Sequence, residues 1–226
     1  MDHILSFQIS VAGDRVYQHI CRFAAAEYQR RYGINLETFP EMFVYGTTPD
    51  DEIVACFGAS WGSNHRHLTT EWYVPEEALA TYLGSPLTTF PRSKLCEIGT
   101  RVVNLPAGCN TNSVRTSVAM SAALLLHLYK EGGQFSLFTA DRSVQVIAKQ
   151  LKVDLMQFGA PDLSRRDAAY VKRWQPYFDV PRGCYGFNLA QAAAGCSDMC
   201  GQLTESGFVF DSGLFDPTPM ELVVSA

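Results

Sequence analysis

The segment KLCEIGTRVVNLPAGCNTNSVRTSVAMSAALLLHLYKEGGQFSLFTAD, residues 94–141, decides the fold. Residues 94–103 are rich in apolar and β-branched types and predict a strand, which Gly99 interrupts as at a bulge or a close backbone approach. Residues 104–112 predict a loop, and apolar residues then recur at helical spacing. Residues 134–140 predict a second strand. A strand, a helix and a parallel strand form a right-handed crossover unit.

The loop before this helix offers a place for an anionic group. Asn110, Thr111 and Asn112 are residue types that cap a helix, and they lie directly before its apolar positions. The free backbone N–H groups of a helix N-terminus attract negative charge. We therefore expect a ligand site where the strand gives way to the helix.

The composition is that of a globular protein: 226 residues, 47% of them hydrophobic and 18% charged. The formal net charge of −5 argues against a general nucleic-acid binder. The longest apolar run, residues 118–129, is too short to span a bilayer, and no signal peptide is evident. We expect a cytoplasmic protein without stable membrane insertion, whose seven cysteines are free thiols.

The rest of the chain predicts a mixed α/β domain over residues 1–194 and a loosely packed tail over residues 195–226. Asp14 is expected to cap the first helix, and Pro75 and Gly84 are expected to flank a short one. The expected strands are residues 5–11, 42–45, 53–61, 154–158 and 184–189. The expected helices are residues 14–31, 76–83, 143–151 and 164–174.

This order of elements resembles the GNAT-type N-acyltransferase fold. The chain also contains the local motifs YLGSPL (82–87), CEIGTRVVNLPAG (96–108), LFTAD (137–141), LKVD (151–154) and WQPYFDVPRGCYG (174–186). These motifs resemble the thermostable hemolysin family, which is similar to acyl-homoserine-lactone synthases and to long-chain N-acyl amino acid synthases. The resemblance implies a mixed, mostly antiparallel twisted sheet with a splayed central strand and helices on both faces.

The resemblance also implies an activity, the transfer of a fatty acyl group from a thioester to an amine. No tightly bound cofactor is implied; the co-substrate is acyl-phosphopantetheine on an acyl carrier protein, or acyl-CoA. The chain departs from the pattern in two places. Residues 108–115 lack the Gly-x-Gly pyrophosphate loop, and residues 100–103 interrupt the family's E-x-G-N-L run.

By resemblance, the central strand carries the reacting groups. Glu97 is the candidate general base, and the alternative is a surface carboxylate paired with Arg101 or Lys94. Arg101 either holds an acceptor carboxylate or is an exposed strand residue. The backbone of Val102, Val103 and Asn104 is expected to contact the pantetheine arm.

The start of the long helix and the end of the next strand hold further candidates. Asn112, Ser113 and Arg115 are expected to bind the phosphate of the arm, although Arg115 equally suits a nearby carboxylate. Thr139 and Asp141 lie where open α/β sheets place ligands, and Asp141 is otherwise a helix cap.

Aromatic side chains, Trp61 and Tyr82 among them, either line an acyl pocket or pack in the core. Cys109 is a candidate nucleophile or a plain loop residue. His65 and His67 lack further ligands at a matching spacing, so no metal site is expected.

Four basic residues are expected on one helix, where they form either a docking surface for an acidic acyl carrier protein or a solvated face. They are Arg165, Arg166, Lys172 and Arg173. An alternative from another class is a non-catalytic acyl- or lipid-binding protein, or a hemolysin-like toxin, on the same fold.

Overall fold

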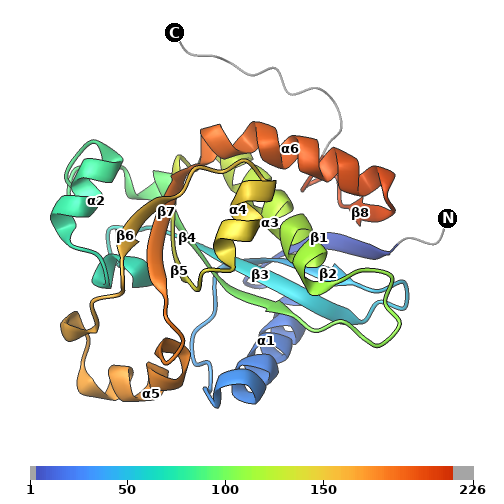
Figure 1. Ribbon diagram of the computed structural model, residues 1–226, viewed down its shortest axis with the longest axis horizontal. Coiled ribbons are helices and arrows are strands. Elements are labelled where there is room, and N and C mark those ends of the chain that lie inside the picture. The colour runs from blue at the N-terminus through green and yellow to red at the C-terminus, as the bar shows by residue number, and fades with distance from the viewer. Residues whose placement is uncertain (1–3, 216–226) are drawn as a thin grey trace, which may run out of the picture.

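The strands form one mixed sheet in the computed structural model, which describes residues 4–215 (Figure 1). They are β1 (Leu5–Val11), β2 (Met42–Thr47), β3 (Ile53–Trp61), β4 (Leu95–Val103), β5 (Phe135–Ala140), β6 (Met156–Gly159), β7 (Gly183–Asn188) and β8 (Phe208–Phe210). Their order is β6-β7-β5-β4-β3-β2-β1-β8. Between these strands, β4 runs parallel to β5 and β1 to β8, and the other neighbours are antiparallel. The predicted mixed, mostly antiparallel sheet is confirmed.

Helices cover both faces of the sheet (Figure 1). They are α1 (Tyr17–Tyr32), α2 (Glu76–Leu83), α3 (Ser113–Lys130), α4 (Val144–Gln150), α5 (Ala168–Phe178) and α6 (Leu189–Glu205). Helices α3, α4 and α6 share one hydrophobic cluster with the sheet, and we call that side the α3 face. Helices α1, α5 and α2 pack through two other clusters on the opposite side, the α1 face.

Strand periodicity explains why one sheet can carry two cores. In β2, Met42 and Val44 pack on the α3 face, while Phe43 and Tyr45 pack on the α1 face. Successive strand residues point to opposite faces, so a strand that is covered on both sides is apolar at every position. All six residues of β2 are buried accordingly.

Of the two helix caps expected from the sequence, Asn112 on α3 is confirmed and Asp14 on α1 is not. Asn112 caps α3, because its side-chain oxygen accepts a hydrogen bond of 2.9 Å from the Arg115 N–H. Asp14 does not cap α1, which begins at Tyr17. Its carboxylate accepts instead from the Val11 N–H at 2.8 Å and closes the turn that follows β1.

The loose tail expected from residue 195 is wrong over residues 195–215. These residues complete α6, on which Cys196, Cys200 and Leu203 are buried, and they add β8 to the sheet beside β1. The expectation rested on the Gly, Ser and Asp residues after position 195, which are poor helix formers, but helix α6 packs against α3 along its length. Residues 216–226 lie outside the described residues.

The packing of β8 can be tested by truncating its buried ring. Phe208 is 1% exposed and stacks on Phe7 with ring centroids 5.9 Å apart. Phe208→Ala should lower the free energy of unfolding by about 3–5 kcal/mol, because it removes a buried aromatic ring. Urea denaturation measures the change. The matched control is Val209→Ala, since Val209 is 44% exposed on the same strand and should cost about 0.5 kcal/mol. Equal, small losses from both variants would contradict a packed β8.

Candidate active site

The site begins where β4 leaves β5. The two strands pair at Leu95 with Phe135, at Cys96 with Ser136 and at Glu97 with Leu137, and their pairing ends there. Beyond that point β4 continues along β3 to Val103, while β5 continues along β7 to Ala140. The predicted splayed central strand is therefore present, and Glu97 stands at the vertex of the gap.

A β-bulge in β4 follows the vertex directly. Cys56 and Gly58 of β3 pair with Val102 and Gly99 of β4, so β4 has one residue more than β3 over this stretch. Thr100 lies in the bulge with a φ of 53°, in the left-handed region that β-branched residues rarely adopt.

The bulge reverses the alternation of β4. Positions 97 and 101 of a regular strand share a face, but here Glu97 faces the α1 side of the sheet and Arg101 faces the α3 side. The ion pair between Glu97 and Arg101, the alternative interpretation of Glu97, is therefore absent from the described structure. Glu97 has no contact with Lys94 either; its partners come from a loop.

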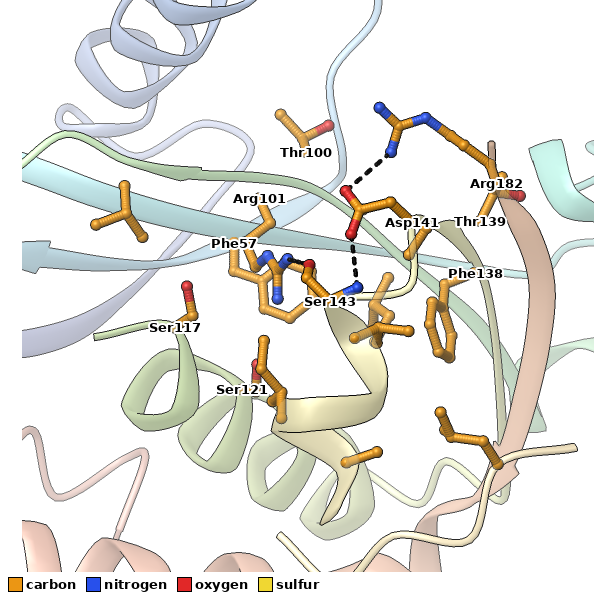
Figure 2. Close-up of a pocket in the computed structure, with 18 of the residues that line it drawn as sticks. Phe57, Thr100, Arg101, Ser117, Ser121, Phe138, Thr139, Asp141, Ser143 and Arg182 are labelled. Atoms are coloured by element: carbon orange, nitrogen blue, oxygen red, sulfur yellow. Dashed lines mark hydrogen bonds and ion pairs between the residues drawn. The ribbon is translucent and has the colours of Figure 1, made fainter. Parts of the chain in front are cut away.

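On the α3 face, the gap opens into a cavity of about 380 Å³, which we call the α3-side cavity (Figure 2). Its inner part is apolar, with Phe57, Leu125, Phe138, Ile147 and Phe187 in its wall. On one wall, α3 presents three hydroxyl side chains on successive turns, which are Ser113, Ser117 and Ser121. The volume lies in the range of small-molecule pockets.

Arginines gather at the outer part of this cavity (Figure 2). Arg182, whose side chain is 4% exposed, pairs with Asp141 at 3.5 Å and stacks on the Tyr177 ring. Arg101 reaches the Ser143 hydroxyl at 3.4 Å, and burial lowers its pKa from the usual value. Burial alone would raise the pKa of Asp141, but hydrogen bonds from Ser143 and the two arginines lower it overall.

On the α1 face, the same gap opens into a second cavity of about 470 Å³, the α1-side cavity. Both cavities are lined by Ile98, Gly99, Thr100 and Thr139, so they meet at the gap between the strands. The wall of the α1-side cavity is mixed: it combines Glu97, Arg166 and other polar side chains with several aromatic rings.

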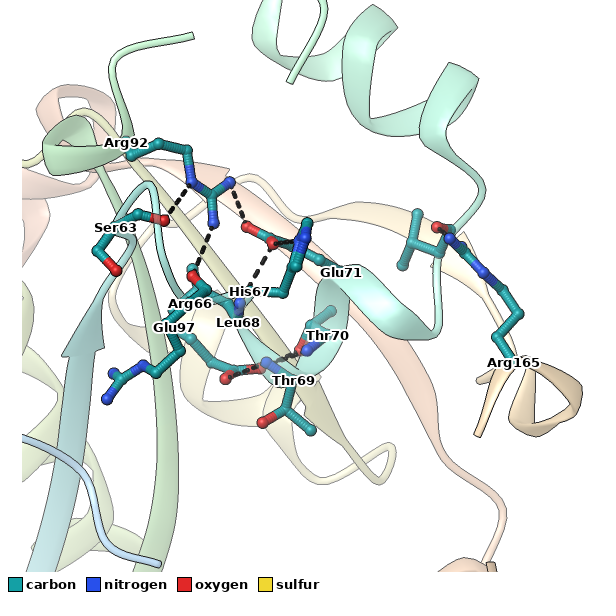
Figure 3. A network of polar contacts seen from close by, with 11 residues as sticks. Ser63, Arg66, His67, Leu68, Thr69, Thr70, Glu71, Arg92, Glu97 and Arg165 are labelled. Carbon is teal, nitrogen blue, oxygen red and sulfur yellow. Dashed lines mark hydrogen bonds and ion pairs between the residues drawn. The ribbon is translucent and has the colours of Figure 1, made fainter. Parts of the chain in front are cut away.

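Glu97 is held by the 3-10 helix Thr69–Trp72 (Figure 3). Its carboxylate accepts from the Thr69 N–H at 2.8 Å, and from the Thr70 N–H and hydroxyl at 2.6 Å each. Burial is the largest influence and raises the pKa of Glu97, although these three hydrogen bonds lower it in part. The result is a fixed carboxylate with a raised pKa inside a cavity.

A second carboxylate, Glu71, fixes the same 3-10 helix (Figure 3). It pairs with Arg92, accepts from the Leu68 N–H at 3.1 Å and contacts the His67 ring at 3.0 Å. His67 is thereby engaged with a protein group. Among the described residues, no group of three or more His, Cys, Asp or Glu side chains could hold a metal ion.

The other residues expected to contact the donor are placed unevenly. Val103 and Ser113 line the α3-side cavity, but the side chain of Val102 is buried in the α1-face core. Asn104 donates to Glu27 at 2.9 Å instead of facing the gap. The bulge explains the difference, because the stretch of β4 exposed to the gap is residues 98–101.

Arg115 turns away from the gap. Its guanidinium donates to the Ser206 hydroxyl and stacks on the Phe208 ring at 5.0 Å. Together with Asn112 it borders a shallow surface depression outside the α3-side cavity. Arg115 therefore belongs to the contact between the start of α3 and the end of α6.

The expected substrate residues also differ in position. Thr139 lines both cavities at the gap. Trp61 packs against the α3-face core, and Tyr82 packs edge-on against Phe135 and Phe158, so neither lines either cavity. Both are packing residues, the alternative interpretation of their aromatic character.

The four basic residues do not form one helix face. Helix α5 begins at Ala168, so Arg165 and Arg166 precede it. Arg165 donates to the Val74 carbonyl at 2.7 Å, Arg166 lines the α1-side cavity, and Arg173 pairs with Glu37. Lys172 is exposed and makes neither an ion pair nor a side-chain hydrogen bond among the described residues.

Several lining residues were not singled out from the sequence. Ser117 and Ser121 follow Ser113 at intervals of four, a helical stripe that the sequence displays. Arg182 and Tyr177 come from segments distant along the chain, so only the fold brings them to the gap.

The strain at the bulge can be measured. Thr100→Gly should raise the free energy of unfolding by about 0.5–1 kcal/mol, because glycine adopts a positive φ without a clash and part of the gain is lost to unfolded-chain entropy. The matched control is Thr139→Gly on the facing strand, which should lower stability. Urea denaturation reports both. If the two variants lose equal stability, Thr100 is not strained.

Comparisons with known proteins support this architecture. The acyl-homoserine-lactone synthase LasI aligns with a TM-score of 0.58 at 9% identity, covering 86% of this chain and 95% of its own. The CoA-dependent acyl-homoserine-lactone synthase BjaI, solved with SAM and isopentyl-CoA, aligns with a TM-score of 0.57 at 12% identity over 92% and 93%. FeeM, an N-acyl amino acid synthase from uncultured soil microbes, aligns with a TM-score of 0.53 at 8% identity over 83% and 98%.

At these identities the structural matches establish a shared fold. No curated protein sequence matches the chain. No helix within residues 4–215 is long and apolar enough to cross a membrane. The sequence model of one family does match, over residues 11–191, which is most of the chain. The protein belongs to the thermostable hemolysin family.

Proposed function

We propose that this protein is an N-acyltransferase, which moves a fatty acyl group from a thioester to the amine of an amino acid or small metabolite. One observation carries the proposal: two cavities of different chemistry meet at the gap between β4 and β5, with the Glu97 carboxylate at its vertex. Two substrates can thus reach one point from opposite faces of the sheet. The acyltransferases LasI, BjaI and FeeM share this fold, which supports the same conclusion.

The donor occupies the gap and the α3-side cavity. A pantetheine arm carries amide groups and lies along β4 like an added strand, using backbone groups that β5 leaves free. The apolar inner wall takes the acyl chain, since burial of its methylene groups is favourable. Arg101 and Arg182 suit the phosphate of the arm.

The donor's carrier is either an acyl carrier protein or CoA, because both present the same arm. Arg165, Lys172 and Arg173 are exposed near α5 and offer cationic contacts to an acidic carrier protein. Comparing acyl-carrier-protein and acyl-CoA donors in one thiol-release assay distinguishes the two.

The acceptor enters the α1-side cavity and its amine meets Glu97. The amine nitrogen attacks the thioester carbonyl while Glu97 accepts a proton from the nitrogen. The C–S bond then breaks, the thiolate leaves with the arm, and the proton that Glu97 holds passes to the sulfur. Transfer is direct, without an acyl-enzyme, so it requires no cysteine nucleophile.

Glu97→Gln should lower the rate of thiol release by about 10²–10⁴-fold, because the amide cannot accept the proton. Cys109→Ala should leave the rate unchanged. In the wild type the rate should fall as the pH drops through the pKa of Glu97, since only the carboxylate form is a base, and the inflection should lie above the usual 4.5.

Glu71→Gln is the matched control for Glu97→Gln. It disturbs the same 3-10 helix from outside both cavities, so it should leave the acidic limb of the pH profile in place. A rate that depends on Cys109 and not on Glu97 would contradict direct transfer. Absence of thiol release with every donor and a wide panel of amines would favour a non-catalytic acyl-binding protein.

The acyl chain can be located with two substitutions on α3. Ser117→Leu and Ser121→Leu both fill the α3-side cavity, one helical turn apart. Each should shorten the longest chain accepted, and the limits of the two variants should differ by about 6 Å of chain, since four residues of helix rise by that length. Thiol release across acyl chains of increasing length measures the limit. An equal loss for all chain lengths would place the acyl chain elsewhere.

A further inference from the structure

Arg166 is an unpaired cation in the wall of the α1-side cavity. Its guanidinium lies over the Tyr170 ring at 3.8 Å and near the Trp72 ring at 5.4 Å. Its Nε is buried and has no hydrogen-bond partner within residues 4–215. A buried donor without a partner costs about 1–3 kcal/mol, so this Nε favours the binding of a hydrogen-bond acceptor in the cavity.

The other charged groups of this cavity all have partners. Arg173 pairs with Glu37, Arg66 pairs with Glu41, and His67 contacts Glu71. The Glu97 carboxylate is held by N–H and hydroxyl donors, which leave it without a cationic partner in the described structure. The cavity therefore holds one cation and one carboxylate that are not paired with an opposite charge.

Arg166 and Glu97 share the α1-side cavity with a pair of tyrosines, Tyr73 and Tyr170. The Tyr73 and Tyr170 hydroxyls are hydrogen-bonded to each other. Burial raises the pKa of both phenols, and each also responds to the positive charge of Arg166 and the negative charge of Glu97. Both charges thus act on the same few side chains inside the cavity.

We propose that Arg166 binds the α-carboxylate of the acceptor, so that the acceptor is an α-amino acid whose amine faces Glu97. This inference rests on the proposed function and specifies its acceptor. A guanidinium presents two parallel N–H donors to a carboxylate, and stacking on Tyr170 holds its plane in place. The zwitterion supplies one opposite charge to each unpaired group. Before the reaction its ammonium loses one proton to the solvent, and the neutral amine then attacks while Glu97 accepts the second proton.

The rest of the wall indicates a large apolar or aromatic side chain on the acceptor. Phe39, Trp174, Tyr177 and Phe178 line the cavity, and such rings offer apolar area and stacking surfaces. S-adenosylmethionine also carries an α-amino carboxylate on a group that stacks, so it is a second source of the same chemistry. The two sources are separated by experiment.

The test measures binding, independently of acyl transfer. Tryptophan fluorescence of the full-length protein, in which Trp174 lines the cavity, follows titration with L-phenylalanine, L-leucine and S-adenosylmethionine. Phenylalanine and leucine are each compared with their carboxamides. The wild type should bind at least one acid, and bind a carboxamide at least about tenfold more weakly, since the bidentate contact is lost.

Arg166→Gln should abolish this preference, leaving acid and amide equally weak, and Arg166→Lys should restore part of it. Lys149→Gln is the matched control, because it removes one positive charge from the exposed surface of α4, outside both cavities, and should change nothing. The comparison of acid with amide on the wild type stands even if a variant fails to fold.

An unchanged acid preference in folded Arg166→Gln, or no binding of any of the three acids to the wild type, would overturn the assignment. The assignment would also be overturned if inorganic phosphate bound to the wild type in place of the acids and did not bind to Arg166→Gln. That result would indicate a phosphate site. Binding that depends on Arg166 without any thiol release would keep the carboxylate site and reject the transferase.

Discussion

Everything in this structure depends on a sheet that stops pairing at its centre. After Glu97 the two strands β4 and β5 separate, and their backbone groups along the gap need other partners. Side chains supply some of them: Tyr177 donates to the Thr139 carbonyl at 3.3 Å, and Arg31 donates to the Val103 carbonyl. The gap is therefore a stable feature of the fold, and residues of α1 and α5 satisfy part of its free backbone.

The bulge at Thr100 turns this gap into two different sites. One additional residue in β4 moves Arg101 to the α3 face and leaves Glu97 on the α1 face. The charged side chains at the gap are thus divided between the two faces of the sheet. Arg31, Arg101 and Arg182 lie with Asp141 on one side. On the other side, Arg166 and Glu97 lack a partner of opposite charge among the described residues, whereas Arg66 and Arg173 of the same cavity are paired. Backbone strain at a single threonine is the cost of that separation.

The sequence predicted most strands and helices, because their periods and caps are local. The Asn112 cap and the bounds of β3 follow from residues that are adjacent in the sequence. Gly99 predicted a bulge or a close backbone approach in β4, and the bulge lies directly after it. The faces on which Glu97 and Arg101 lie could not be predicted, since the register of β4 is set by β3, far away in the chain. The packed helix and strand after residue 195 were missed for a similar reason: Phe208 pairs with the first strand and not with a neighbour in sequence.

The two arginines before α5 are adjacent in the sequence but lie in different environments. Arg165 and Arg166 are adjacent, yet Arg165 donates to a backbone carbonyl near α2 and Arg166 lies inside the α1-side cavity. A count of basic residues would assign them one role on one surface. Their burial and partners separate them, because a charge on the surface is solvated at little cost whereas a charge within a cavity requires a counter-charge. The unpaired charges of the α1-side cavity therefore indicate the chemistry of the acceptor. The net charge of the chain does not indicate which carrier delivers the acyl group.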